Sequence, residues 1–296
     1  MSAPWLMVVA SFLFATMSVC VKLASADYGT GEIVFYRSLT GALIIGVVSR
    51  WQGATLRTPV PAMHFWRSLT GVTALMLWFY AIGNLPLATA VTLNYSSSVW
   101  MALFLIGGAS VLGTRPVDPR LIVAVMFGFA GVALILRPTI EQQQLWHGVI
   151  GLLSGMVSAT AYLQVSALGR AGEPETRIVF YFSVGGIVAG GLMSTVTGWH
   201  SHDAAGLALL LSIGLLATVA QLMMTRAYAK GRALVNASLQ YLGIAFSFGY
   251  GVLVFDDRIT WMAVAGMLMI VGAGVRATLL RSRALPAAAN TPPAET

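Results

Sequence analysis

Ten mostly apolar stretches follow one another along this chain, and each is long enough to cross a lipid bilayer as an α-helix. Prolines such as Pro61, Pro86 and Pro174 stand at their edges, where a missing N–H costs a helix least. The stretches cover residues 4–24, 31–50, 64–84, 87–112, 119–137, 147–169, 175–197, 205–229, 233–255 and 259–280. This pattern predicts an all-α polytopic membrane protein with ten transmembrane helices.

The composition argues against a water-soluble fold. Hydrophobic residues make up 57% of the chain and charged residues only 9%, whereas soluble domains carry roughly 25% charged residues. The net charge of +7 does not indicate nucleic-acid binding, because the charges stand at the ends of the apolar stretches. The single cysteine, Cys20, excludes an intrachain disulfide. The expected surroundings are therefore a lipid bilayer.

The distribution of Lys and Arg predicts the orientation, since these residues are enriched on the cytoplasmic side of membrane proteins. With the N-terminus in the cytoplasm, 13 of the 17 Lys and Arg residues fall on that side. The other four, Lys22, Arg37, Arg137 and Arg258, fall on the opposite side. Both termini are therefore expected in the cytoplasm, most simply that of a bacterium with this chain in its inner membrane.

The two halves of the chain repeat one another. Ile33–Tyr36 returns letter for letter as Ile178–Tyr181, at an offset of 145 residues. Ala90–Tyr95 returns in altered form as Asn236–Tyr241, at an offset of 146 residues. Two separated matches at nearly one offset indicate that one half of the chain is a copy of the other.

The repeat predicts an inverted architecture. Each half holds five spans, and because five is odd the second copy lies upside down relative to the first. Inverted repeats of this kind are typical of transporters that work by alternating access. We expect a first five-helix repeat over 1–138, a second over 139–284, and a disordered cytoplasmic tail over 285–296.

The ionisable residues do not indicate an enzyme. The acids stand in turns, in the tail or near the ends of stretches, so no buried proton relay is expected. The four histidines lack the helical spacing of a zinc site, and no phosphate-binding glycine motif occurs. No metal and no cofactor are predicted. Lys22 and Arg37 are interpreted as residues that extend toward the membrane surface, with an anion-attracting role at the outer mouth as the alternative.

A substrate site should then be built from side chains of unbroken helices, because no broken helix is visible in the sequence. Polar and small residues recur at helical spacing in stretches 147–169, 205–229 and 233–255. The stretches 64–84 and 87–112 carry aromatic, amide and hydroxyl groups instead. The predicted substrate-binding residues are Met76, Phe79, Tyr80, Asn94, Tyr95, Ser98, Trp100, Ser158, Tyr162, Thr218, Gln221, Gln240 and Tyr241. Packing against lipid or other helices is the alternative for each.

Ten spans, inverted halves and the run from Ala81 through Pro86 to Ala90 resemble the EamA branch of the drug/metabolite transporter superfamily. The resemblance covers residues 4–283 and is nearest to the YddG-type amino-acid exporters. It implies a central cavity lined by the first, third, fourth, sixth, eighth and ninth helices, with the fifth and tenth at the periphery. It also implies aromatic cavity residues at Tyr80, Tyr95, Trp100 and Tyr162.

The sequence therefore predicts an exporter of small neutral or zwitterionic metabolites, foremost aromatic and other apolar amino acids. The absence of a basic residue at mid-depth argues against phosphorylated substrates. The alternatives are an exporter of drugs or lipophilic cations, and a membrane scaffold or sensor that transports nothing. One chain holds both halves, so a monomer is expected to suffice, although small-residue faces also permit a dimer.

Overall fold

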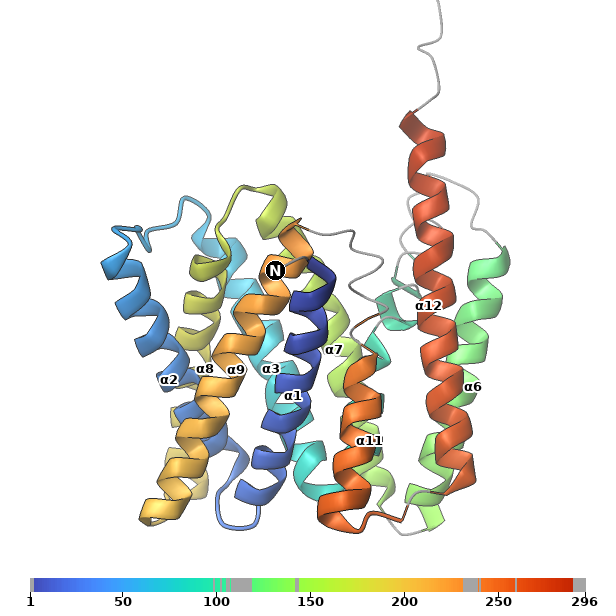
Figure 1. The fold of residues 1–296 in the computed structure, drawn as a ribbon, viewed down its shortest axis with the longest axis horizontal. Helices are drawn as coiled ribbons and strands as arrows, with labels where there is room; N and C mark the ends of the chain where they lie inside the picture. Colours follow the sequence, from blue (N-terminus) through green and yellow to red (C-terminus); the bar gives the residue numbers. More distant parts are fainter. Residues whose placement is uncertain are drawn as a thin grey trace, which may run out of the picture.

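The computed structural model describes residues 3–97, 99–101, 103–104, 107, 119–141, 144–230, 239, 241–258 and 260–289. Within these residues the secondary structure is helical and no strand occurs. The helices run side by side in alternating directions (Figure 1). The predicted all-α fold is confirmed.

Five described helices belong to the first half of the chain. Pro61 opens α3, where its missing N–H leaves no bond unmade, and the sequence Leu85-Pro86 separates α3 from α4. The helices are α1 (Ala3–Ala24), α2 (Thr30–Trp51), α3 (Pro61–Asn84), α4 (Leu87–Tyr95) and α6 (Pro119–Glu141).

Five more described helices belong to the second half. Gly172 and Gly198 follow α7 and α8 with φ angles of 81° and 99°, which glycine adopts without strain. The helices are α7 (Leu145–Arg170), α8 (Glu175–Thr197), α9 (Ala204–Lys230), α11 (Leu242–Phe255) and α12 (Trp261–Ala289). Helix α12 continues past residue 285, where the tail was expected to begin.

The expectation of unbroken helices is wrong at two places. Helix α4 ends at Tyr95, Ser96 forms a turn, and helical residues resume at Ser97. The second break is at Tyr241, the turn residue before α11. Near the first break the Ser96 hydroxyl donates to the Leu93 carbonyl at 2.6 Å. Such local bonds compete with the helical ladder and bend helices.

Helix packing is unchanged when the two halves are exchanged. Helix α1 packs on α9 as α7 packs on α3, while α2 packs on α8 and α6 on α12. The pair α6 and α12 stands at one edge of the bundle (Figure 1), where the resemblance placed the fifth and tenth helices. These pairings are those of a twofold axis that relates the two halves.

The crossing of α2 and α8 shows the same relation at single residues. A Cβ at Gly41 would lie 2.9 Å from Ser183 Oγ, and a Cβ at Gly186 would collide with Ser38. Residues 38 and 183 are 145 positions apart, as are 41 and 186. The repeat offset thus exchanges the two contacts, so the axis passes between α2 and α8.

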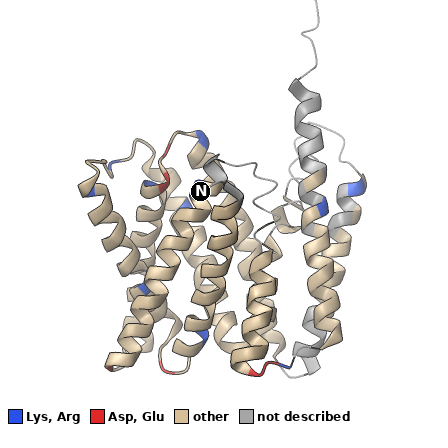
Figure 2. Ribbon diagram, in the orientation of Figure 1, with Lys and Arg blue, Asp and Glu red and all other residues tan. Residues whose placement is uncertain are grey.

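The outer surface suits lipid. Leu192, Val196 and Leu253 are among the large apolar side chains that stand exposed. Most charged residues lie near the two ends of the bundle (Figure 2). We call the end with Arg50 and Arg170 the basic end, and the end with Asp27, Asp203 and Asp257 the acidic end.

In the described part of the chain, five helices are long and apolar enough to cross a membrane. They are Trp5–Ala24, Thr30–Trp51, Leu145–Arg170, Glu175–Thr197 and Ala204–Ala227. The apolar helix α11 is shorter because of the break at Tyr241, and α4 is short because of the break at Ser96.

Candidate functional site

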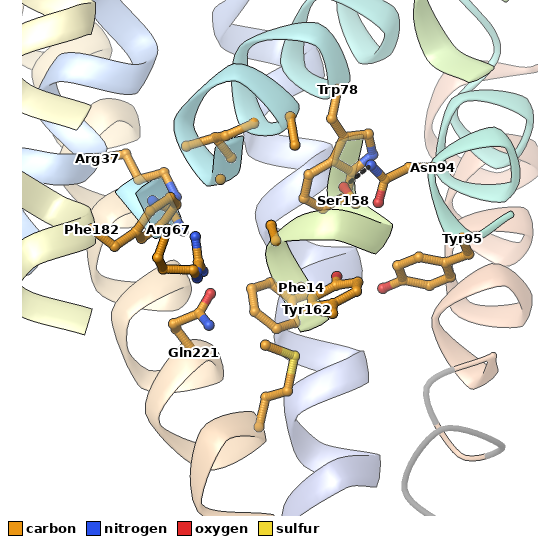
Figure 3. Close-up of a pocket in the computed structure, with 15 residues that line it drawn as sticks. Phe14, Arg37, Arg67, Trp78, Asn94, Tyr95, Ser158, Tyr162, Phe182 and Gln221 are labelled. Carbon is orange, nitrogen blue, oxygen red and sulfur yellow. Dashed lines mark hydrogen bonds between the residues drawn. The ribbon is translucent and has the colours of Figure 1, made fainter. Parts of the chain in front are cut away.

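A cavity of about 70 Å³ lies among helices of both halves (Figure 3). It has a cationic side, formed around Phe182, and a side of aromatic and small polar groups. Its lining residues are Phe14, Arg37, Arg67, Gly71, Ala74, Leu75, Trp78, Asn94, Tyr95, Ser158, Ala161, Tyr162, Phe182, Gln221 and Met224. The volume holds only a few water molecules, so a small metabolite does not fit in this conformation.

Two arginines from neighbouring helices form the cationic side. Arg37 of α2 is 6% exposed and Arg67 of α3 is 5% exposed. Their guanidinium carbons lie 5.3 Å and 4.6 Å from the centre of the Phe182 ring. Both cations therefore contact one aromatic ring of α8, and Gln221 of α9 lies beside them (Figure 3).

Neither guanidinium is neutralised by the residues that the structure describes. No hydrogen bond or ion pair joins Arg37 or Arg67 to another described residue, and Arg67 Nε and Nη1 are buried without a partner. The Cβ that Gly71 lacks would overlap the Arg67 guanidinium. The glycine therefore leaves the space in which that cation lies.

The other side of the cavity is formed where α4 meets α7. Asn94 Nδ2 donates to Ser154 Oγ at 3.0 Å and to Ser158 Oγ at 3.2 Å. A Cβ at Gly155 would lie 2.5 Å from the Leu93 carbonyl oxygen, so glycine is required for the two helices to approach. Trp78 Nε1 is buried without a hydrogen-bond partner among the described residues. This side offers aromatic faces and a few polar atoms.

Five of the predicted site residues line this cavity, namely Asn94, Tyr95, Ser158, Tyr162 and Gln221. They come from α4, α7 and α9, and therefore from both halves of the chain. Helical spacing along α7 was the signal for Ser158 and Tyr162. Ser98 and Gln240 lie outside the described residues.

The remaining predicted residues are placed away from the cavity lining. The Tyr80 ring lies 5.5 Å from that of His147, and the Trp100 ring lies 4.8 Å from that of Phe129 on α6. Thr218 Oγ1 donates to the Gly214 carbonyl. The other three pack in or against the apolar core: Met76, Phe79 and Tyr241.

Sequence reasoning missed the two arginines and the ring between them. The expectation that no basic residue reaches the interior is wrong, because Arg37 and Arg67 both line the cavity. Arg37 had been assigned to the membrane surface. One signal was present: Arg37 and Phe182 are 145 positions apart, so they are repeat equivalents of opposite character. The cavity lining implied by the resemblance also left out the helices that carry Arg37 and Phe182. These are α2 and α8, which correspond to the second and seventh predicted stretches.

A buried ionic cluster ties helices together at the basic end. Glu173, in the turn between α7 and α8, accepts from His64 Nε2 at 3.0 Å and from Arg177 Nη1 at 3.0 Å. Burial alone would raise the pKa of Glu173, but the hydrogen bonds from His64 and Arg177 outweigh burial and lower that pKa below 4.5. The Glu173 carboxylate is therefore a stable acceptor at neutral pH.

The repeat relates this cluster to one at the acidic end. Arg177 Nη2 donates to the Thr55 carbonyl at 3.1 Å. At the other end the His200 N–H donates to Glu32 Oε1 at 2.8 Å. Residues 32 and 177 are 145 positions apart, as are 55 and 200. Each half thus secures the start of its second helix to a loop of the other half, with opposite charge.

A third set of polar contacts, made by Asp257 and Lys22, joins the two halves near α4; we call it the tie at Asp257. Asp257 Oδ2 accepts the Leu87 N–H at 2.8 Å, and Asp257 Oδ1 lies 3.4 Å from Lys22 Nζ. Lys22 Nζ also donates to the Leu85 carbonyl at 2.9 Å. The carboxylate caps the N-terminus of α4 and pairs with a cation of α1.

The apolar surface, the inverted halves and the cavity between them define a polytopic membrane transporter rather than an enzyme. The sequence pattern of the EamA-like transporter family matches residues 1–137. The pseudopaline exporter of Pseudomonas aeruginosa is 34% identical over 279 residues, which are 90% of this chain and 92% of that protein. The chain belongs to the EamA-like transporter family.

More distant relatives support the same class. Human solute carrier family 35 member G1 is 26% identical over 286 residues, or 91% of this chain and 76% of that protein. A riboflavin transporter of Rhizobium johnstonii is 29% identical over 218 residues, which are 74% of this chain and 68% of that protein. One solved crystal structure, 18% identical, covers 95% of this chain and 98% of its own with a TM-score of 0.64. That likeness is one of fold.

Proposed function

We propose that this chain exports small carboxylate-bearing metabolites, amino acids among them, from the bacterial cytoplasm by alternating access. The observation that carries the proposal is the cavity between the two halves, with two guanidiniums that no described residue neutralises. Relatives named as exporters and transporters support the direction and the class.

The size of the cavity supports a moving mechanism. Binding sites for small molecules usually measure about 300–1,000 Å³, whereas this cavity measures about 70 Å³. A metabolite therefore enters only after helices of the two halves separate at one end. Rocking of inverted halves about their axis would open the two ends in turn.

The lining supports a carboxylate as the recognised group. An arginine binds a carboxylate through two parallel hydrogen bonds, which are strong where water is excluded. The side chain of an aromatic or apolar amino acid would lie against Trp78, Tyr95 and Tyr162 on the other side of the cavity. Two like charges disfavour the alternative substrates, lipophilic cations.

The topology in the membrane follows from charge. We propose that the basic end faces the cytoplasm, together with both termini, because Arg and Lys concentrate there. We further propose that a monomer is the working unit, because one chain supplies both walls of the cavity.

Purified protein in liposomes tests the proposal by counterflow of labelled amino acids, organic acids and methyl viologen. Saturable counterflow of at least one carboxylate-bearing solute, absent from protein-free liposomes, is the expected result. The variant Trp51→Ala, at an exposed position (85% exposed), is the matched control and should transport normally. Counterflow of methyl viologen alone, or of no solute, would contradict the proposal.

A further inference from the structure

Arg37 and Arg67 point to a more specific substrate than the proposed function requires. Resting on that function, we propose that the transported metabolite carries two carboxylates, one for each guanidinium, on an apolar or aromatic body. The next steps derive this dicarboxylate from the charge, the geometry and the lining of the cavity.

Charge balance gives the number of anionic groups. The cavity lining contains two arginines and no aspartate or glutamate, so the site carries two positive charges. Burying an unpaired charge is costly, and a partner of opposite charge removes much of that cost. A dicarboxylate neutralises both guanidiniums. A zwitterionic amino acid brings no net charge, and its ammonium group is repelled by the same two cations.

The two arginine side chains come from opposite directions and meet at one ring. Helix α2 begins at the acidic end and α3 at the basic end (Figure 1). Arg37 is seven residues into α2 and Arg67 six residues into α3, which places each about 10 Å along its helix. The guanidiniums therefore reach Phe182 from opposite ends of the bundle. Two guanidiniums that approach from opposite sides can each bind a separate carboxylate.

The rest of the lining accommodates the body of the substrate. Phe14, Trp78 and Tyr162 present aromatic surface across the cavity from the arginines (Figure 3). The unpartnered Trp78 Nε1 can donate to one further polar atom. A dicarboxylate in this position contacts α2 and α3 of the first half and α8 and α9 of the second. Its binding thus links the two bodies that must move.

A series of ligands that share a phenyl group tests the inference on the full-length protein in detergent and in liposomes. Phenylsuccinate has two carboxylates, 3-phenylpropionate has one, phenylalanine is a zwitterion, and phenyl phosphate carries its two charges on a single group. Phenylsuccinate should raise the melting temperature most and compete best in counterflow, by at least tenfold over 3-phenylpropionate and phenylalanine.

Variants assign this preference to the arginines. Arg37→Gln and Arg67→Gln should each weaken phenylsuccinate binding at least tenfold and remove its advantage over 3-phenylpropionate. Arg57→Gln, at an exposed site in the loop before α3, should bind like the parent. Gly71→Ala, which displaces the Arg67 guanidinium but keeps its charge, should weaken binding by a smaller factor. If a Gln variant does not fold, the uncharged Met variant at that position replaces it, with the same loss of preference expected.

Each outcome is decisive. Equal binding of phenylalanine and phenylsuccinate, or an unchanged preference in both arginine variants, would overturn the inference and leave the proposed function intact. Strongest binding of phenyl phosphate would overturn it in favour of phosphate monoesters. A structural role for the arginines predicts that Arg37→Leu and Arg67→Leu melt lower than the parent, whereas a binding role predicts equal or higher melting without transport. Counterflow of no solute in any assay would refute the proposed function itself.

Discussion

Helices α2 and α8 are the same segment in two copies, and the comparison between them separates what the fold needs from what the site needs. Both contain the sequence Ile-Val-Phe-Tyr, and they cross through reciprocal glycine–serine contacts. At the next position the copies diverge, with Arg37 on α2 and Phe182 on α8. Packing is thus kept symmetric, while the chemistry of the cavity is made asymmetric at the axis.

The largest expected effect comes from breaking the shared packing. A Cβ at Gly190 would lie 2.7 Å from the Phe35 backbone nitrogen and 2.8 Å from the Gly31 carbonyl oxygen. Backbone cannot yield as a side chain can, so Gly190→Leu should destabilise the protein by about 3 kcal/mol or more. Melting in detergent measures this. Gly46→Leu, on a face of α2 with open space, should melt like the parent, and equal loss in both variants would contradict the account.

Making the two copies alike at the point of divergence should abolish transport without harming the fold. Arg37→Phe places the residue of α8 on α2 and removes a buried charge. We expect transport to fall at least tenfold, with a melting temperature equal to or above that of the parent, because a buried cation without a partner is costly. Counterflow and melting of the same preparation measure both. Full transport by Arg37→Phe would show that the asymmetry has no functional role.

The tie at Asp257 has a smaller expected effect. Asp257→Ala removes the cap of α4 and the partner of Lys22, and should lower stability by about 1–2 kcal/mol. Asp27→Ala is the control, since Asp27 is an exposed acid at the same end. Comparison of the two melting curves measures the stability that the Asp257 contacts contribute. Identical curves would show that these contacts contribute none.

The smallest effect is a dependence of stability on pH at the basic end. Burial would raise the pKa of Glu173, but the hydrogen bonds from His64 and Arg177 together outweigh burial and lower the folded pKa. A lowered pKa contributes stability that is present above the unfolded value and is lost as pH falls through the folded value. Melting should therefore respond little to Glu173 near pH 7, and the stability that Glu173 contributes should be lost in the acid range in which carboxylates titrate.

The variant His64→Phe tests whether the loss of stability in acid comes from the hydrogen bond between His64 and Glu173. It retains an aromatic ring against Tyr181, whose centre lies 4.5 Å from that of His64, but loses the hydrogen bond to Glu173. The acid-dependent part of its melting curve should be smaller than in the parent. An unchanged acid response would mean that another carboxylate governs it.

Much of the fold could be predicted from the sequence, because apolar length and repeat spacing act over whole helices. The α7 stripe that includes Gly155, Ser158 and Tyr162 was also readable, since it follows the helical period. The breaks at Ser96 and Tyr241 could not be predicted, because local hydroxyl bonds and turns do not interrupt the run of apolar residues in the sequence. Arg37 was misplaced because position along a helix does not show whether a long side chain turns inward.

The sequence also did not show how deep each charged side chain lies in the membrane. Arg67 counted as an edge charge in the sequence, yet its guanidinium occupies the space beside Gly71 and lines the cavity. That space is created by a missing side chain on the same helix and by Phe182 from a distant part of the chain. Only the packed structure brings these three residues together.

The most direct test of the central claim is the ratio of counterflow rates for phenylsuccinate and 3-phenylpropionate, measured in the parent and in Arg67→Gln. The two solutes share a body and differ by one carboxylate, so the ratio reports what the second charge contributes at the site. The account predicts a ratio of about ten or more in the parent and near one in the variant. The same ratio in both proteins would contradict it.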